Sequence, residues 1–279
     1  MEILKEHVLS EFSRFLREDN PEWDVAGIIF SKKKACFEVL LKSEAYVPQL
    51  YIFRWILENY GIDVTGIREP GFFSNIQLFE LKGEASTILA LERTFLNLLS
   101  HFLGVATVTR KAVMKAEEVS PDTRIAATRK TYPGLRFFEK MAVYLAGGDT
   151  HRVSLRDMVM LKDNHIALWD GDLENLIEET RKKTGFSRKI EIEVDSLQML
   201  KRVLDSDIDI VMLDNFTPLE VRKAVDMIRS RNKRITIEVS GGITLSNLKD
   251  YLACKVDVIS MGSLIHSAPW INVSMEVCS

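Results

Sequence analysis

From about residue 105 onward, short apolar runs alternate with stretches that have the amphipathic spacing of helices. Apolar strands separated by helices are typical of parallel strands that are buried on both faces. We expect strands at 125–127, 158–161, 190–194, 208–213, 235–239 and 256–260, and helices at 173–183, 197–204, 218–231 and 245–252. This many units favours an α/β barrel of parallel strands, an incomplete or complete TIM-like barrel, over an open doubly wound sheet.

The residues before 105 follow a different pattern. Apolar spacing predicts helices at 4–18, 47–60 and 87–103 and strands at 35–41 and 76–81. Gly61 and Gly104 are expected to end the second and third of these helices. A length of 279 residues accommodates a barrel with a smaller companion. We therefore expect an N-terminal α/β sandwich domain over 1–104, an α/β barrel over 105–268, and a segment, 269–279, that returns to the first domain.

Every predicted barrel strand ends in residues suited to an anionic ligand or its metal. In parallel barrels, ligands bind at the carboxyl ends of the strands, and phosphate often binds the loops after the last strands. These strand ends carry Arg129, Lys130, Lys162, Glu193, Asp214, Ser240, Gly241, Gly242, Gly262 and Ser263. The carboxyl edge of the barrel is therefore the candidate site.

The last two of these loops contain glycine, which lets backbone N–H groups approach a phosphate. A tight strand-to-helix turn would also explain one Gly-Gly pair, but two consecutive loops of this kind favour phosphate binding. On the acidic side, Glu193 and Asp214 end neighbouring strands and could hold magnesium together with substrate phosphates. Glu191 faces the same side as Glu193 and is an alternative ligand. A buried salt bridge to Lys130 or Lys162 is the purely structural alternative.

The basic strand ends suit a small substrate with several negative charges. Arginine binds carboxylates and phosphates through two parallel hydrogen bonds, and lysine supplies a compact charge. Solvated surface charges are the alternative, because most lysines and arginines lie at the surface. On sequence alone, Arg93 is best interpreted as a capping or surface residue.

Composition limits the partners and the compartment. A net charge of −3 argues against nucleic acid, and no apolar run approaches the ~20 residues of a membrane span. Cys36, Cys254 and Cys278 form no metal-binding pattern, and an odd count favours reduced thiols in a cytoplasmic protein. The chain begins with an amphipathic helical pattern in place of a signal peptide. Paired histidines at zinc-ligand spacing are absent from the sequence.

Three long motifs follow one another along the chain. They are T-R-K-T-x-P-G-L-R over 128–136, G-G-x-x-H-R over 147–152 and L-K-D-N-H-I over 161–166. In this order and spacing they resemble the quinolinate phosphoribosyltransferase family, also called nicotinate-nucleotide pyrophosphorylase (carboxylating). The similarity runs from about residue 92 to about residue 268. It implies transfer of phosphoribose from phosphoribosyl pyrophosphate to quinolinate with decarboxylation, which gives nicotinate mononucleotide for NAD biosynthesis.

The resemblance also implies roles for individual residues. It places quinolinate against Arg129, Arg152, Lys162 and His151, and pyrophosphate against Lys130 and Lys162. It assigns magnesium and the ribose hydroxyls to Glu193 and Asp214, and it makes Lys130, Lys162, Glu193 and Asp214 the catalytic residues. The implied substrate-binding set is completed by Arg93, Thr128, Ser240, Gly241, Gly242, Gly262, Ser263 and His266.

In this family, the arginine at the position of Arg93 crosses a dimer interface, so the resemblance implies a homodimer with shared sites. The chain departs from the family pattern at Ala127, Ser154 and Leu103, where Asp, Gly and Ser are usual, and over 23–26. A related nicotinate or molybdate-transport-linked phosphoribosyltransferase and a non-catalytic anion-binding homologue remain the alternatives.

Overall fold

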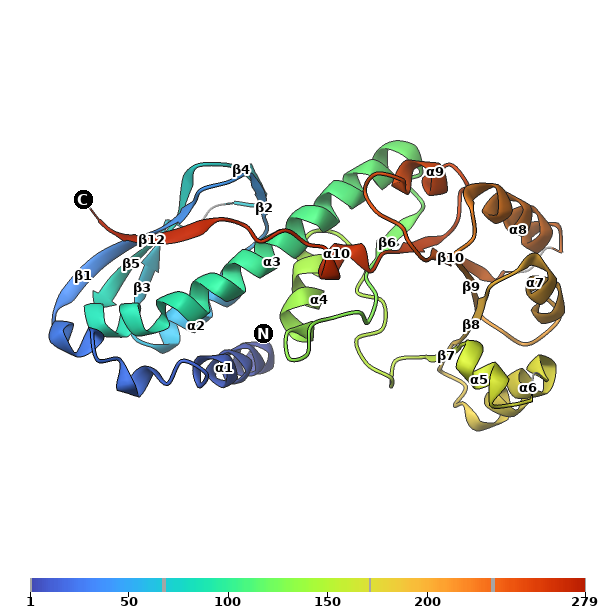
Figure 1. Ribbon diagram of the computed structural model, residues 1–279, viewed down its shortest axis with the longest axis horizontal. Coiled ribbons are helices and arrows are strands. Elements are labelled where there is room, and N and C mark those ends of the chain that lie inside the picture. The colour runs from blue at the N-terminus through green and yellow to red at the C-terminus, as the bar shows by residue number, and fades with distance from the viewer. Residues whose placement is uncertain (1, 67–68, 171, 232–233, 279) are drawn as a thin grey trace. The chain divides into compact units, whose positions relative to one another are not determined.

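The computed structural model describes residues 2–66, 69–170, 172–231 and 234–278 (Figure 1). The chain divides into two compact units, Met1–Thr107 with Ala268–Ser279, and Val108–Ser267. One helix, α3 (Ala85–Val119), begins in the first unit and ends in the second. The expected end near Gly104 is therefore wrong. A Cβ atom at Gly104 would lie 2.0 Å from the carbonyl oxygen of Pro269, so this glycine permits close backbone packing inside a continuous helix.

The first unit contains an antiparallel four-stranded sheet in the order β12-β1-β5-β3. Its strands are β1 (Lys34–Leu41), β3 (Asp63–Thr65), β5 (Ile76–Glu84) and β12 (Val273–Val277). A separate two-stranded ribbon pairs β2 (Ala45–Val47) with β4 (Gly71–Phe73). The helices are α1 (Glu2–Leu16), α2 (Tyr51–Asn59) and the beginning of α3, with 3₁₀ turns η1 (Pro21–Trp23) and η2 (Gly27–Phe30). Helix α2 begins later than expected because residues 45–47 form a strand.

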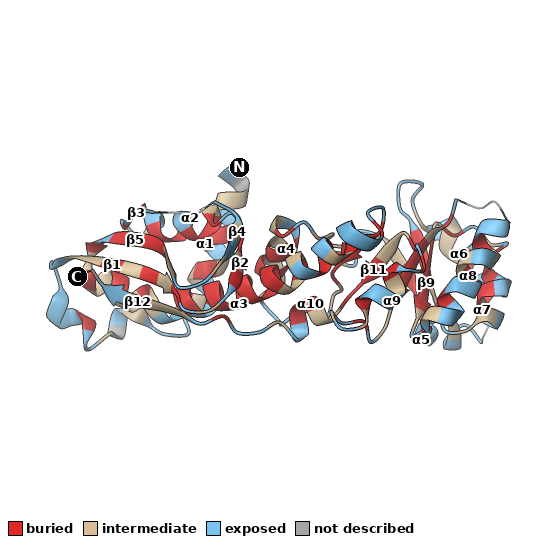
Figure 2. Ribbon diagram, turned by 90° about the horizontal axis from the view of Figure 1, so that it is seen from above, coloured by how far each residue is buried: buried red, intermediate tan, exposed pale blue. Residues whose placement is uncertain are grey.

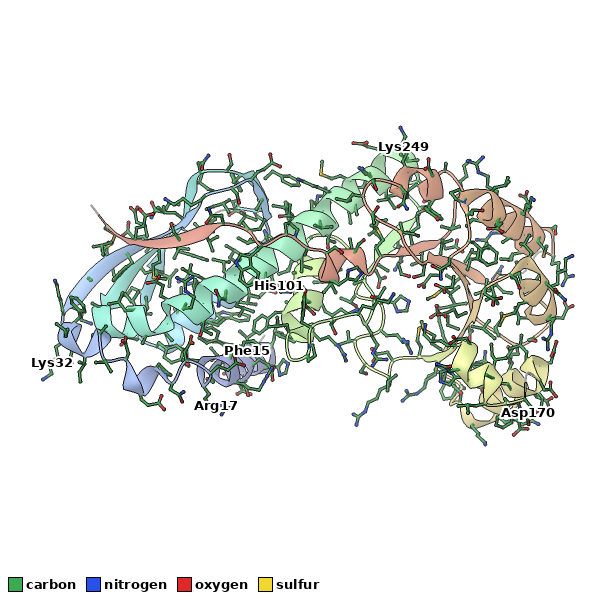
Figure 3. The ribbon with its side chains drawn as sticks, viewed as in Figure 1. Phe15, Arg17, Lys32, His101, Asp170 and Lys249 are labelled. Atoms are coloured by element: carbon green, nitrogen blue, oxygen red, sulfur yellow. A yellow bond between two sulfur atoms is a disulfide. The ribbon has the colours of Figure 1, made fainter. Side chains whose placement is uncertain are left out.

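Aromatic side chains fill the core of this unit, where buried residues line the sheet and α3 (Figure 2). The Phe53 ring meets the rings of Phe95 and Phe102 edge to face, with centroids 5.7 and 5.1 Å apart. Buried rings of this kind contribute packing energy beyond their apolar area. The ring centroids of His101, also on α3, and Trp270 are 6.3 Å apart. Figure 3 labels His101 together with Phe15, Arg17 and Lys32, which lie on other segments of the same unit.

A disulfide joins Cys36 of β1 to Cys278, which directly follows β12. The two Cα atoms are 5.4 Å apart, and the backbone N–H of Cys278 donates to the carbonyl oxygen of Cys36 at 3.0 Å. The prediction of reduced thiols is therefore wrong for this pair, because strand pairing brings together two residues separated by 242 positions. Cys254 is free and buried.

Cys278→Ser is expected to destabilise the first unit by about 2–4 kcal/mol, because the disulfide closes a long loop in the unfolded chain. The measurement is thermal unfolding with and without reductant. Reductant should lower the midpoint of the wild-type protein to that of Cys278→Ser and leave the variant unchanged. A wild-type midpoint that does not respond to reductant would show that this bond does not stabilise the protein in solution.

The second unit contains six parallel strands in the order β6-β11-β10-β9-β8-β7. They are β6 (Arg124–Ala126), β7 (Val159–Leu161), β8 (Ile190–Val194), β9 (Ile210–Asp214), β10 (Thr236–Ser240) and β11 (Val258–Ser260). Sequence order runs continuously from β7 to β11, and β6 then pairs with β11. A doubly wound sheet would reverse its strand order near the middle. The circular order therefore confirms an α/β barrel, which is incomplete because β6 and β7 are the two ends of the sheet.

Helices follow these strands, as predicted for 173–183, 197–204, 218–231 and 245–252. They are α4 (Arg136–Leu145), α5 (Asp163–Ala167), α6 (Leu173–Lys183), α7 (Leu197–Val203), α8 (Pro218–Ser230), α9 (Leu248–Leu252) and α10 (Ser263–His266). Helices α4 and α5 were not predicted. Helix α8 has a capping box between Thr217 and Glu220. Helix α9 begins three residues later than expected because Asn247 accepts from the Thr244 N–H at 2.8 Å and donates to the Gly242 carbonyl at 3.1 Å. These contacts hold residues 242–247 as a loop.

Helix α3 is long and apolar enough to cross a membrane when judged by length and composition alone. However, 67% of its most apolar window is buried inside the protein. Burial of this kind is typical of a core helix.

Candidate active site

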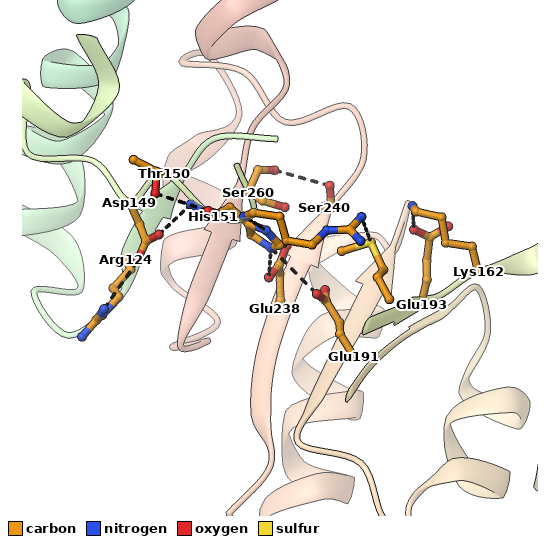
Figure 4. Close-up of polar contacts among 12 residues, drawn as sticks. Arg124, Asp149, Thr150, His151, Lys162, Glu191, Glu193, Glu238, Ser240 and Ser260 are labelled. Atoms are coloured by element: carbon orange, nitrogen blue, oxygen red, sulfur yellow. Dashed lines mark hydrogen bonds and ion pairs between the residues drawn. The ribbon is translucent and has the colours of Figure 1, made fainter. Parts of the chain in front are cut away.

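The carboxyl ends of the barrel strands surround a cavity of about 460 Å³. The predicted residues that line it are Thr128, Arg129, Lys130, His151, Arg152, Lys162, Glu193, Asp214, Ser240, Gly241 and Gly242. Segments distant in sequence thus meet at one site because parallel strands end at the same edge of the sheet. Figure 4 shows part of this arrangement, with Lys162 and Glu193 beside one another and Glu191 and Glu238 beneath His151.

One side of the cavity is acidic. Lys162 Nζ forms an ion pair with the Glu193 carboxylate, as the structural alternative anticipated. Burial, and then the negative charge of Glu193, raise the pKa of Asp214 above its usual value. Two carboxylates that repel one another are a suitable oxygen donor set for a hard cation. Glu193 and Asp214 therefore fit magnesium chemically.

Glu191 lies deeper in the barrel than Glu193 and does not line the cavity. It is fully buried, and burial followed by the charge of Glu238 raises its pKa well above the usual value. Within the described residues, neither Glu191 carboxylate oxygen has a hydrogen-bond partner. Of the two predicted alternatives, Glu193 is the residue that can reach a ligand in the cavity.

Another part of the cavity lining is basic. Arg152 is only 8% exposed, and burial lowers the pKa of its guanidinium. The buried Arg129 Nε lacks a hydrogen-bond partner among the described residues. Arg152 Nη2 donates to Met160 Sδ at 2.9 Å, and a thioether is a weak acceptor, so an anion bound here would be a stronger partner for both side chains. This is the chemistry expected of a carboxylate pocket.

A tightly held loop places Arg152 in the cavity. His151 has a left-handed backbone, with a φ of 51°, and its N–H donates to Asp149 Oδ1 at 2.7 Å. Lys140 Nζ from α4 donates to the Thr150 carbonyl, and burial is the largest cause that lowers the pKa of Lys140 to about 8. One contact within the loop and one from α4 thus hold residues 149–152.

The two glycine-containing loops provide close backbone approaches. At Gly241, with a φ of 98°, a Cβ atom would lie 2.2 Å from Asn215 Oδ1. At Gly262, a Cβ atom would lie 3.2 Å from Lys130 Cδ and 3.0 Å from His266 Nε2. Ser263 Oγ donates to the Ile243 carbonyl at 2.8 Å and so ties the two loops together.

Four predicted residues do not line the cavity. Gly262, Ser263 and His266 lie in the loop after β11 and in α10, with Gly262 next to Lys130. Arg93 belongs to the first unit, where its side chain is 70% exposed and lies 3.8 Å from Glu92. Its predicted contact with substrate therefore stays a prediction.

Sequence reasoning missed Met160, Met212, Glu238 and Ser260, which line the cavity together with Ala127 and Asn215. Glu238 is the most informative of these. It is only 1% exposed and is a charged residue within the apolar run of β10. A glutamate at an inward position of an otherwise apolar strand was the available signal.

This chain resembles known proteins over most of its length. Residues 105–276 match the family model described as the C-terminal domain of quinolinate phosphoribosyl transferase. The chain belongs to the quinolinate phosphoribosyltransferase family. A protein from Methanocaldococcus jannaschii, named as a probable nicotinate-nucleotide pyrophosphorylase (carboxylating), is 39% identical over 99% of both chains.

Members of the family from distant organisms give the same result. The nicotinate-nucleotide pyrophosphorylase (carboxylating) of Homo sapiens is 31% identical over 94% of this chain and 89% of its own. The solved structure of the nicotinate-nucleotide pyrophosphorylase from Francisella tularensis matches with a TM-score of 0.85 and 29% identity, and the match covers 96% of each chain. The predicted family is thus confirmed.

The departures from the family pattern have local structural consequences. Ala127 is buried and uses its N–H to donate to the Asp149 carbonyl at 2.9 Å, which joins β6 to the loop that carries Arg152. Ser154 Oγ donates to Asp157 Oδ1 at 3.1 Å and so supports a surface turn. Ala127 lines the cavity, so it places a methyl group where the family usually has an aspartate, whereas Ser154 is not among the lining residues.

Proposed function

We propose that this chain is a pentosyltransferase that converts quinolinate and phosphoribosyl pyrophosphate into nicotinate mononucleotide, pyrophosphate and carbon dioxide in NAD biosynthesis. Family membership supports the reaction class. The observation that carries the proposal is that one cavity is lined by two arginines, buried Arg152 and half-buried Arg129, and by the carboxylates of Glu193 and Asp214. Such a site suits a dicarboxylate acceptor and a magnesium-bound phosphorylated donor.

The arginine side of the cavity would bind quinolinate. A pyridine dicarboxylate brings two negative charges, and each can accept charge-assisted hydrogen bonds from a guanidinium. Holding both carboxylates fixes the plane of the ring and directs its nitrogen toward the anomeric carbon of the donor. Arg129 and Arg152 are therefore the proposed orienting residues, and Lys162, which pairs with Glu193, is the proposed third cation of the quinolinate pocket.

The acidic side would bind the donor. Glu193 and Asp214 are the proposed ligands of magnesium and of the ribose hydroxyls. Magnesium would neutralise charge on the departing pyrophosphate. Lys130 and Lys162 would add positive charge to the same leaving group, while residues 240–242 and 262–263 would bind the 5-phosphate through backbone N–H groups.

No protein nucleophile is needed for this reaction. The bond between the anomeric carbon and pyrophosphate breaks as the ring nitrogen bonds to that carbon. The resulting pyridinium accepts the electron pair left when the bond to the 2-carboxylate breaks and carbon dioxide departs. A proton then replaces the carboxylate on the ring. The residues of this chain bind, orient and neutralise charge throughout.

We further propose a cytoplasmic homodimer with shared active sites that acts on these two small molecules, without nucleic acid or membrane partners. The negative net charge supports the part that excludes nucleic acid, and the burial of α3 supports the part that excludes a membrane. The Cys36–Cys278 disulfide removes the cysteine-based argument for the compartment, so the cytoplasmic assignment rests on the soluble biosynthetic character of the reaction.

The purified protein is expected to release pyrophosphate from phosphoribosyl pyrophosphate only when quinolinate and a divalent ion are present. Nicotinate should be a poor substrate because it leaves one buried cationic partner without a carboxylate. The measurement is pyrophosphate release with each acid, with and without a chelator. Equal turnover of nicotinate and quinolinate would contradict the dicarboxylate assignment. Tight quinolinate binding without any turnover would indicate a non-catalytic homologue.

A further inference from the structure

The ring of His151 lies between a buried carboxylate and the main chain that carries Arg152. The Arg152 N–H donates to His151 Nδ1 at 2.7 Å, and His151 Nε2 lies 3.0 and 3.2 Å from the two Glu238 carboxylate oxygens (Figure 4). Because Nδ1 accepts a hydrogen bond, Nε2 is the nitrogen that carries a proton and donates to Glu238. Both ring nitrogens are therefore engaged within the protein. This ring is not free to donate to a substrate.

Burial makes these contacts strong. The side chains of His151 and Glu238 are 11% and 2% exposed. A buried carboxylate that lost its donor would be strongly unfavourable, so Glu238 holds the ring in one orientation. The ring in turn fixes the Arg152 N–H, and the Asp149 and Lys140 contacts hold the same loop from its other side.

This chain of contacts also accounts for the unusual backbone at His151. A left-handed conformation at a residue other than glycine is unfavourable, and it persists only where surrounding contacts enforce it. At His151 the enforcing contacts are made on both sides of the ring. The conformation turns the chain so that the next residue, Arg152, lines the cavity.

Resting on the proposed function, we propose that Glu238 is a positioning residue of the acceptor pocket. Through the His151 ring, it holds the main chain at Arg152 in the conformation that presents the guanidinium to a quinolinate carboxylate. Glu238 thus acts on substrate binding without touching the substrate, and His151 serves as the connection between them.

A metal ion is the competing interpretation of this group. Ligand atoms of His151, Glu191 and Glu238 lie within 4.8 Å of one another. However, although burial lowers the pKa of the Arg152 guanidinium, the charges of Glu191 and Glu238 oppose that shift, so the guanidinium lies near both carboxylates and would repel a cation bound between them. The hydrogen bonds to His151 already use both of its nitrogens. The positioning role therefore accounts for the contacts of His151 with Glu238 and Arg152 better than a metal site does.

The test uses Glu238→Leu, which removes the acceptor, and Glu238→Gln, which keeps one acceptor oxygen. Glu238→Leu is expected to weaken quinolinate binding about 10- to 100-fold and to change the KM for phosphoribosyl pyrophosphate by less than about twofold. Glu238→Gln should be intermediate. The matched control is Glu178→Leu on the exposed face of α6, which should bind both ligands normally. Quinolinate titration, both KM values and thermal unfolding are measured on the full-length protein.

A double-mutant cycle separates positioning from a general structural effect. If Glu238 acts through the ring, then Glu238→Leu with His151→Phe should bind quinolinate no more weakly than Glu238→Leu alone. This apolar pair also avoids leaving the His151 Nε2–H donor buried without an acceptor if Glu238→Leu folds poorly. Effects that multiply, or normal quinolinate binding by the folded double variant, would overturn the proposal.

Two further results distinguish the remaining interpretations. A stoichiometric metal that is bound by the wild-type protein and lost in Glu238→Leu would overturn the positioning role in favour of a metal site. A wild-type protein that neither binds nor turns over quinolinate would instead contradict the proposed function. With an active wild type, unchanged quinolinate binding in Glu238→Leu overturns only the inference about Glu238.

Discussion

Arg152→Ala is expected to weaken quinolinate binding about 10- to 150-fold while leaving the binding of phosphoribosyl pyrophosphate within about twofold. The reason is that Arg152 is almost fully buried at the basic side of the cavity, where a carboxylate would be its charge-assisted partner. Titration of the variant with each ligand separately is the measurement. Arg156→Ala, an exposed arginine of the following turn, is the control and should bind both ligands normally.

The same titrations on Asp214→Ala should give the reverse pattern, with a weakened magnesium–donor complex and nearly normal quinolinate binding. Asp214 lies on the acidic side of the cavity, where Glu193 and burial raise its pKa. The opposite ligand preferences of the two variants rule out a general folding defect, which would weaken both. Normal quinolinate binding by Arg152→Ala would remove this residue from the proposed pocket.

The barrel was predictable from the sequence because its strands are buried on both faces. The run 210–214, for example, is apolar except for its last residue, so it stands out from the helices beside it. The carboxyl ends of these runs necessarily carry the site in a parallel barrel. For this reason the sequence pattern alone was sufficient to place Lys162, Glu193 and Asp214 together.

The features that sequence reasoning missed depend on contacts between distant segments. In the sequence alone, Gly104 predicts the end of a helix. Only the close approach of the Pro269 backbone to α3 explains a glycine at this position. The Cys36–Cys278 disulfide requires the pairing of β12 with β1, which no local pattern specifies. Likewise, Glu238 becomes significant only when β10 brings it to His151, which lies 87 positions earlier in the sequence.

The last expected result concerns Arg93, which lies in the first unit and is mostly exposed. The family resemblance implies that this arginine enters the active site of the neighbouring subunit. If so, Arg93→Ala and Lys162→Ala should each abolish nearly all activity when present alone. Lys162 pairs with Glu193 within the cavity, so its loss damages the site of its own subunit.

Mixing the two inactive variants distinguishes a shared site from a site within one subunit. In a mixed dimer, one site would combine both lesions and the other would contain neither. Random reassortment of equal amounts makes about half of the dimers mixed, so about a quarter of all sites should recover activity. Turnover after co-expression or co-refolding is the measurement, with the fraction of mixed dimers determined by mass.

A mixture of Lys162→Ala with Asp214→Ala is the matched control for this experiment. Both of these lesions lie in the barrel cavity of the chain that carries them, so each site of a mixed dimer keeps one lesion and no activity should return. Recovery with Arg93→Ala but not with Asp214→Ala would place Arg93 in the neighbouring subunit's site. If confirmed mixed dimers of Arg93→Ala and Lys162→Ala stay inactive, Arg93 acts within its own subunit or supports the fold.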